Sequence, residues 1–317
     1  MEFKQLRALL TIADTGSVTR AAELLHIVQP AVSRQLRLLE EDVGTALFER
    51  GHNRMELTES GRILVEYARR ALHNLDRARA EITPQLGEVA GIVTIGLVPS
   101  LVNLLTSPVM ATVTARYPGI KLRFSTGGYS DLMQDWVEAG EVDLALVSDY
   151  KPSPRIQAEP LLEEKLWVVG PAAAGLRADR PLPISELAGK PLILPSSFKG
   201  FRLLVEHACT LEGVQLTIAV ETNSVHVQRC LVLGGHGLTI LPIVAVAEDV
   251  ALGLLTAAPL TTPEVTRKIL LAMPSIGRIP QRVRCVAAVI VEEMRDTLLR
   301  GDWPAARWLA AARRSEP

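Results

Sequence analysis

The first forty residues place apolar side chains at helical spacing, and two breaks divide them into three predicted helices. Gly16 and Ser17 form the first break, and the Ser17 hydroxyl can cap a second helix over residues 18–25. The second break is the short connection 26–28, after which Pro30 can open a third helix without losing a hydrogen bond. The apolar positions of the three helices are Leu6, Leu9, Leu10, Ala13, Ala21, Ala22, Leu24, Leu25, Val32, Leu36 and Leu39.

The outer face of the third helix is polar and carries arginine, as expected for a helix that enters the major groove of DNA. The second and third helices are short and joined by a tight turn, and the third has a polar face with arginine. This combination predicts a helix-turn-helix. Arg can bond guanine through two donors, Gln can pair with adenine, and Ser can donate to a base or a phosphate. A solvated helix face has the same composition, and a protein-protein module is a further interpretation of this region, so both alternatives stay open. The polar residues of this face are Gln29, Ser33, Arg34 and Arg37.

Residues 47–50 and 55–58 read as two short strands joined by a polar, basic tip, which predicts a β-hairpin. Beside a recognition helix such a hairpin is a wing, and Arg50 and Arg54 would contact the DNA backbone or the minor groove. The region 1–58 has a net charge of −1. DNA binding therefore requires its arginines to gather on one side. The acidic residues that would then lie elsewhere are Glu40, Glu41, Asp42 and Glu49.

A single long helix is predicted from Glu59 to about residue 87, with Thr58 as its cap. Its apolar positions alternate in steps of four and three, the rhythm of a coiled coil. Packing against the protein's own body would give the same stripe. A two-fold DNA site, however, calls for a two-fold protein, which favours dimerisation through this helix. The stripe comprises Leu64, Ala68, Ala71, Leu75, Ala78 and Ile82.

From Gly91 onward the pattern changes to short apolar runs separated by helical patterns, which predicts a mainly parallel α/β sheet. The runs are 92–98, 144–147, 166–169, 192–194, 238–241 and 269–273. Ligands of such sheets bind beyond the carboxyl ends of the strands, often at helix N-termini that favour an anion.

Five polar turns follow predicted strands in this region and supply candidate ligand-binding residues. Helix capping explains any one of these turns equally well, but together they would line one cleft. Lys199 and Arg202 would supply charge for a carboxylate or lie exposed on the surface, and Phe201 would form an apolar wall. The candidates are Pro99, Ser100, Leu101, Gly127, Gly128, Ser148, Lys199, Phe201 and Asn223.

Composition adds mainly exclusions. A chain of 317 residues is too long for one core, so two or three domains are expected. The longest apolar run, 238–247, is too short to span a membrane, and the amino terminus does not read as a signal peptide. Three cysteines are too few for a disulfide framework and are interpreted as small apolar core residues. A reduced, cytoplasmic protein is therefore predicted.

Sequence motifs of catalysis and metal binding are missing. There is no His-Glu-x-x-His, no Gly-x-Ser-x-Gly and no Gly-Lys-Ser/Thr phosphate loop. The six histidines show no metal-ligand spacing with cysteines or carboxylates. We therefore predict no cofactor, no metal site and no enzymatic activity.

Residues 16–61 resemble the winged helix-turn-helix of LysR-type transcriptional regulators. The match runs from Gly-Ser-Val-Thr-Arg-Ala-Ala-Glu-Leu-Leu at 16–25 through Gln-Pro-Ala-Val-Ser-Arg-Gln-Leu at 29–36 to Leu-Phe-Glu-Arg at 47–50 and Leu-Thr-Glu-Ser-Gly at 57–61. The downstream region has the length and order that this family implies. The resemblance implies an α/β fold class: an N-terminal winged helix-turn-helix, a long linker helix and a two-lobed effector domain like periplasmic binding proteins.

The resemblance also implies residue roles, domain limits and assembly. It implies groove contacts at Gln29, Pro30, Ser33 and Arg34, and wing contacts at Arg50 and Arg54. Pro84, Gly87 and Gly91 set a boundary near residue 88. With the two lobes that the resemblance implies, the domains would be 1–58, 59–88, lobe I at 89–163 and 267–300, lobe II at 164–266, and a tail at 301–317. The usual assembly would be a tetramer built as a dimer of dimers. Peroxide-sensing members use a cysteine pair, but Cys209 has no partner a few residues before it, so redox sensing is not predicted.

The favoured hypothesis is a transcriptional regulator that binds double-stranded DNA and a small anionic effector, such as a carboxylate, between its lobes. A homodimer or homotetramer and contact with RNA polymerase belong to this hypothesis, and a membrane partner does not. The competing hypothesis is a solute-binding protein or an enzyme with an accessory helical domain. A solute-binding protein for transport should carry an export signal. An enzyme should show a paired acid and base, or a nucleophile, at the cleft.

Overall fold

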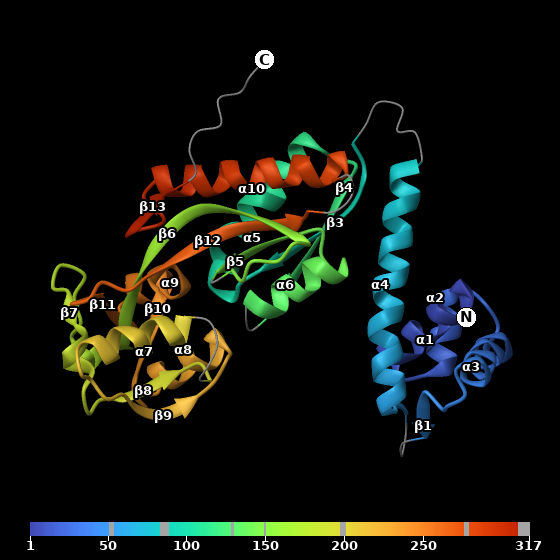
Figure 1. Ribbon diagram of the computed structural model, residues 1–317, viewed down its shortest axis with the longest axis horizontal. Helices are drawn as coiled ribbons and strands as arrows, with labels where there is room; N and C mark the ends of the chain where they lie inside the picture. Colours follow the sequence, from blue (N-terminus) through green and yellow to red (C-terminus); the bar gives the residue numbers. More distant parts are fainter. Residues whose placement is uncertain are drawn as a thin grey trace. The chain divides into compact units, whose positions relative to one another are not determined.

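The computed structural model describes residues 1–50, 54–82, 89–127, 130–148, 150–196, 201–275 and 279–309. The chain divides into two compact units, Met1–Pro84 and Gln85–Pro317 (Figure 1). The domain limits derived from the sequence remain predictions, and the one at residue 88 falls outside the described residues. None of the described helices is long and apolar enough to cross a membrane.

The first unit is a three-helix head followed by a hairpin and a long helix. Its elements are α1 (Phe3–Thr15), α2 (Val18–Leu25), α3 (Gln29–Val43), β1 (Phe48–Arg50), β2 (Met55–Leu57) and α4 (Glu59–Ile82). The predicted cap of α2 is confirmed, because the Ser17 hydroxyl accepts a hydrogen bond from the Arg20 amide at 3.3 Å. Thr58 begins α4 in the same way and accepts from the Gly61 amide at 3.0 Å. Local capping signals therefore set the starts of these helices.

One apolar core holds the head together and includes the beginning of α4. Ala68 is buried in this core and Leu64 packs against it, so these two positions of the predicted coiled-coil stripe are used within the chain. Other apolar side chains of α4 remain open to solvent: Ile63, Tyr67 and Leu75 are 52%, 61% and 38% exposed. The buried members of the core are Ala8, Leu9, Ile12, Ala21, Ala22, Val32, Leu36, Leu39, Leu47, Phe48 and Ala68.

The predicted hairpin is confirmed. β1 and β2 pair antiparallel with Phe48 opposite Leu57. The Met55 amide donates to the Gly16 carbonyl at 2.9 Å, which fixes the hairpin to the turn between α1 and α2. Residues 51–53 of the predicted tip, 51–54, lie outside the described residues.

The described residues of the second unit form an eleven-stranded sheet, and its two lobes share the long strand β6 (Ile156–Pro171). In the first lobe the strand order is β4-β3-β5-β12-β6, with α10 over one face and α6 over the other (Figure 1). The other elements of this lobe are β3 (Gly91–Leu97), a 3-10 turn (Pro99–Leu101), α5 (Val102–Arg116), β4 (Ile120–Thr126), α6 (Ser130–Ala139), β5 (Leu144–Ser148), β12 (Thr266–Pro274), α10 (Gln281–Leu299) and β13 (Ala306–Trp308).

In the second lobe the strand order is β6-β10-β8-β9, and β11 pairs with both β6 and β7. Its apolar cores are packed by α7, α8 and the strands themselves. The elements are β7 (Leu182–Pro183), β8 (Pro191–Leu194), α7 (Phe201–Leu211), β9 (Thr217–Glu221), α8 (Val225–Leu233), β10 (Leu238–Pro242), α9 (Ala247–Ala251) and β11 (Leu255–Thr261), with 3-10 turns at Ala172–Ala174, Ile184–Leu187 and Ile243–Ala245.

The sheet is mixed, so the mainly parallel sheet predicted from the sequence is wrong in its middle. β3 runs parallel to β4 and β5, and β8 runs parallel to β9 and β10. β6 runs antiparallel to β12 over 156–165 and to β10 and β11 over 166–171. Parallel neighbours need a crossover connection. Because β6 passes from one lobe to the other without a crossover helix, the rule that predicts parallel pairing does not apply there.

A buried polar cluster lies where β6 changes partners. Glu164 accepts from Arg267 Nε and from the Trp303 indole nitrogen, each at 2.8 Å, through its two carboxylate oxygens. Arg267 also donates to Ser100 Oγ at 2.6 Å. Because Trp303 follows α10, the cluster ties the end of the chain to the lobe junction. Residues 310–317 of the predicted tail lie outside the described residues.

Candidate functional sites

The outer face of α3 is open to solvent because the helix is anchored through Val32, Leu36 and Leu39 on its other side. Four of the predicted contacts are exposed and Ser33 is half-buried. The Gln29 side-chain amide donates to Ser33 Oγ at 3.2 Å. Their helical spacing places the predicted contacts Gln29, Pro30, Ser33, Arg34 and Arg37 on one face.

The two arginines of α3 differ in their partners. Arg34 makes no ion pair with the residues that the structure describes. Arg37 lies 3.5 Å from Glu41, and both side chains of this pair are at least 60% exposed. Exposed ion pairs contribute about 0–1 kcal/mol. A phosphate can therefore replace the carboxylate of Glu41, and Arg34 has no such competitor.

The wing carries the other two predicted cations. Arg54 immediately precedes β2 and lies 3.5 Å from Glu56, in a pair that is also mostly exposed. Arg50 ends β1 opposite Met55, and its side chain lies outside the described residues.

The acidic side chains of the head are only partly separated from the arginines. Glu40 accepts from the Leu47 amide at 2.8 Å, and Asp42 binds the amino terminus at 2.7 Å. Glu41 lies beside Arg37. The expectation that the listed carboxylates all lie elsewhere is therefore wrong for Glu41, because one helical turn separates it from Arg37.

In the first lobe of the second unit, most of the predicted ligand residues are inside the fold. Leu101 is fully buried in the apolar core, so its predicted place in a cleft wall is not supported. Ser100 and Ser148 are buried, at 4% and 5% exposure. A Cβ on Gly127 would meet the methyl end of the flexible Met133 side chain, so close packing favours a small residue there without any ligand.

In the second lobe, the structure brings two predicted turns together. The Ser196 amide donates to Asn223 Oδ1 at 3.0 Å, and Asn223 Nδ2 donates to Ser196 Oγ at 3.1 Å. Phe201 is half-buried at the start of α7 and packs against both apolar cores of the lobe. Gly128 and Lys199 lie outside the described residues.

Arg202 does not supply free charge to a ligand. Its side chain is 6% exposed and donates to Glu206 at 2.7 Å and to the Pro195 carbonyl at 3.0 Å. Both sequence-based alternatives for this residue, a ligand contact or an exposed surface position, are therefore wrong.

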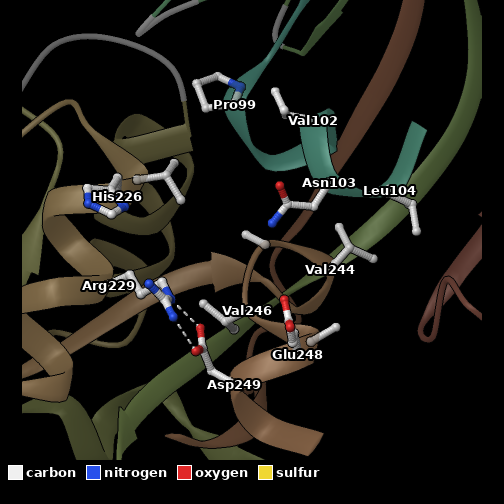
Figure 2. A pocket seen from close by; sticks show the side chains of 13 residues that line it. Pro99, Val102, Asn103, Leu104, His226, Arg229, Val244, Val246, Glu248 and Asp249 are labelled. Carbon is white, nitrogen blue, oxygen red and sulfur yellow. Dashed lines mark hydrogen bonds and ion pairs between the residues drawn. The ribbon is translucent and has the colours of Figure 1, made fainter. Parts of the chain in front are cut away.

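A pocket of about 550 Å³ lies between the two lobes of the second unit (Figure 2). Its size falls within the range of small-molecule sites. Of the predicted ligand residues that the structure describes, Pro99 alone belongs to its lining. The walls are Pro99, Val102, Asn103 and Leu104 from the first lobe, and Val225, His226, Arg229 and residues 244–249 from the second.

The polar groups of this pocket include one compensated ion pair. Arg229 on α8 donates to Asp249 on α9, with Nη2 to Oδ1 at 2.6 Å (Figure 2). This hydrogen bond raises the pKa of Arg229 above its ordinary value. His226 is exposed one turn earlier on α8, and its Nε2 lies 3.6 Å from Cys230 Sγ. Asn103 points into the space between the lobes (Figure 2).

Sequence reasoning missed these polar residues for different reasons. His226 and Arg229 are three residues apart on one helix, so the sequence does contain a signal that they share a face. Asp249 reaches Arg229 only because α8 and α9 are neighbours in the fold, and nothing in the spacing indicates this. Asn103 lies two residues beyond Leu101, the last candidate of the first predicted turn, and the sequence alone does not place it in the pocket.

The three cysteines differ in their burial. Cys209 is buried, and burial raises the pKa of its thiol to about 11. Cys285 is half-buried, but Cys230 is exposed, so its interpretation as a core residue is wrong. Within the described ranges, no three His, Cys, Asp or Glu side chains gather into a possible metal site.

Comparison with protein families gives two matches that together span most of the chain. Residues 3–62 match the family described as bacterial regulatory helix-turn-helix protein, lysR family. Residues 86–295 match the family described as LysR substrate binding domain. The HTH-type transcriptional regulator BbuR of Bordetella bronchiseptica is 30% identical over 92% of this chain and 90% of its own length. The nitrogen assimilation regulatory protein nac of Klebsiella aerogenes is 29% identical over 92% of this chain and 94% of its own length.

Solved structures show the same fold. CbnR, a LysR family transcriptional regulator, is similar with a TM-score of 0.71 and 21% identity, over 92% of this chain and 99% of its own. Full-length CbnR in complex with its target DNA gives a TM-score of 0.69 and 22% identity, over 94% and 100%. A full-length OxyR variant from Pseudomonas aeruginosa gives a TM-score of 0.65 and 24% identity, over 93% of this chain and 95% of its own.

Proposed function

Because this chain belongs to the LysR family of DNA-binding transcriptional regulators, we propose that α3 reads DNA sequence in the major groove and that the wing contacts the backbone or minor groove. The observation that carries this assignment is the exposed face of α3, where Arg34 has no ion-pair partner among the described residues. The proposed base or groove contacts are Gln29, Pro30, Ser33, Arg34 and Arg37, and the proposed wing contacts are Arg50 and Arg54.

The chain is proposed to act as a dimer, or as a tetramer of two such dimers. Ile63, Tyr67 and Leu75 support pairing through α4, because they leave apolar surface on a long helix. A two-fold assembly would present two α3 helices to successive major grooves. RNA polymerase is a further proposed partner, and the cytoplasm, where the chromosome lies, is the proposed location. The proposed activity is binding rather than catalysis.

Selection of bound duplexes from a pool of random sequences tests this function without knowledge of the operator. The full-length protein is expected to enrich one motif with two-fold symmetry, whose half-sites are separated by about one helical turn, or a multiple of it. A pool that shows no enrichment after repeated rounds at low salt would contradict the proposal. Enrichment of an asymmetric motif would retain DNA reading but reject the dimer.

The effector is proposed to be a small carboxylate that binds between the lobes of the second unit. The pocket in Figure 2 supports this by its size and by the polar groups of Asn103 and His226. The charge of Arg229 is already compensated by Asp249, so affinity for an anion would also need the predicted turns at Ser148, Asn223 and their neighbours. A ligand that binds one arrangement of the lobes better than the other would shift their equilibrium.

A thermal-shift screen of small carboxylates and aromatic acids tests the effector proposal. A true effector should raise the melting temperature of the wild-type protein. The same compound should have a smaller effect on Asn103→Phe, because this exposed side chain lines the pocket and a phenyl ring would occupy it. An equal shift in both proteins would place the ligand elsewhere.

A further inference from the structure

A second, larger cavity lies in the first lobe, away from the junction with the second. It has a volume of about 860 Å³ and is lined by α10, β6, β12 and Trp308. We name it the α10 groove. Leu161 and Leu271 form part of its floor and are almost completely buried, whereas Met273 and Trp308 are half-buried. A pocket of this size with mostly apolar walls and a few polar groups is the usual form of a small-molecule site.

One cation in the α10 groove is available to a ligand. The guanidinium of Arg295 lies over the ring of Trp308, 5.5 Å from its centroid. Arg295 forms no ion pair with the described residues. Glu292, one turn earlier on α10, is instead held by Arg116, with Nη2 to Oε1 at 2.7 Å. Among the described residues, the donors of Arg295 therefore have no acceptor, and they lie beside an aromatic surface.

The remaining charges limit what can bind. Arg284, a second cation of the lining, already donates to the Ile279 carbonyl at 2.8 Å. Glu159 and Asp296 bring carboxylates to the same lining. These carboxylates would repel a polyanion such as a nucleotide. A single negative charge placed on Arg295 fits the groove better.

We propose that the α10 groove binds a small molecule with an apolar body and one carboxylate. Arg295 would take the carboxylate through two parallel hydrogen bonds. Trp308, Leu271 and Met273 would cover the apolar body. This site goes beyond the proposed effector pocket, with which it shares no lining residue. The protein would thus hold two ligands in separate places.

Calorimetric titration of the full-length protein with two matched probes tests the proposal. 2-Naphthoate has the required apolar body and carboxylate, and 2-naphthamide is its neutral counterpart. Naphthoate is expected to bind about tenfold or more tightly than naphthamide, since a hydrogen bond to a charged group is worth about 1.5–3 kcal/mol. This comparison uses the wild-type protein, so it does not depend on any variant folding.

Three variants and a control locate the binding. Arg295→Gln should remove the preference for naphthoate over naphthamide. Ala288→Phe, at an exposed position in the lining, should fill the groove and weaken both probes about tenfold or more. Asn103→Phe, in the pocket between the lobes, reports whether either probe binds there instead. Arg177→Ala, an exposed position that belongs to neither lining, is the control and should leave both affinities unchanged within about twofold.

Several results would overturn the proposal. One such result is that the wild-type protein binds neither probe. Another is that Ala288→Phe binds both probes as tightly as the wild type does. Loss of binding in Asn103→Phe alone would place the probe between the lobes, which rejects the α10 groove and leaves the proposed function intact. A changed sedimentation coefficient in Ala288→Phe without a change in probe affinity would identify the groove as a contact between copies of the chain.

Discussion

Replacing Glu164 with glutamine tests the buried cluster at the junction of the two lobes. Oε1 of Glu164 accepts from Arg267 Nε at 2.8 Å and Nη2 at 2.7 Å, and Oε2 accepts from the Trp303 indole at 2.8 Å. The side chains of Glu164 and Arg267 are 2% and 4% exposed. Glutamine offers one acceptor oxygen and one donor nitrogen. Arg267 and Trp303 both donate hydrogen bonds. In the variant, one of them must therefore face the donor nitrogen of the glutamine instead of an acceptor oxygen.

The expected loss in the free energy of unfolding is about 3–5 kcal/mol, because a buried guanidinium is left without its counter-charge. Arg267→Met should cost a similar amount, since it leaves the Glu164 carboxylate unpaired. The double variant Glu164→Met/Arg267→Met leaves no buried charge in this cluster. It would still remove partners from Trp303 and Ser100, at about 1–3 kcal/mol each. The double variant should therefore be clearly more stable than the sum of the two single losses predicts.

Urea unfolding followed by tryptophan fluorescence measures this effect selectively. The four tryptophans, at positions 136, 167, 303 and 308, all belong to the unit Gln85–Pro317, so the first unit does not contribute to the signal. A loss below about 1 kcal/mol for Glu164→Gln would match an ordinary hydrogen bond rather than a buried charge. That result, or simple additivity in the double variant, would refute the reasoning.

Two further predictions concern the head and the cysteines. A Cβ on Gly61 would lie 2.0 Å from the Leu47 carbonyl oxygen, so Gly61→Ala should destabilise the first unit by about 1–3 kcal/mol, with Ser60→Ala as the neutral neighbour. Hydrogen exchange in residues 1–82 should be faster in Gly61→Ala than in the wild type and unchanged in Ser60→Ala. Equal exchange in the two variants would contradict this. Burial raises the pKa of Cys209 to about 11, so at pH 8 its thiol stays protonated; iodoacetamide should modify exposed Cys230 first, and peptide mapping that finds Cys209 modified earlier would reject the argument.

The head could be predicted closely because its signals are local. Ser17 and Thr58 act as caps through bonds to amides three residues away, and Pro30 sits in the first turn of α3. Such interactions depend on adjacent residues, which the sequence shows directly. Packing was harder to predict. Leu24 is an apolar position of the second predicted helix, yet it is 56% exposed, because α2 packs through its small alanines.

The second unit could be predicted only in part because its decisive contacts are remote. β4 and β9 lie at the two ends of the strand order, and nearly all of their residues are exposed or half-buried, so they give no continuous apolar run. Trp303 contacts Glu164 across 139 positions of the chain, and the sequence carries no indication of this pairing. The pocket residues Arg229 and Asp249 were missed for the same reason.

The most direct test of the central claim is the affinity of Arg34→Ala for the selected DNA motif, measured beside the wild type and beside Arg177→Ala, an exposed arginine of the second unit that pairs with Asp179. Arg34→Ala should bind the motif more weakly by about 1–3 kcal/mol, or about 5- to 150-fold, and should lose preference at one base pair. Arg177→Ala should match the wild type. Wild-type affinity and unchanged base preference in Arg34→Ala would contradict the assignment of α3 as the helix that reads DNA.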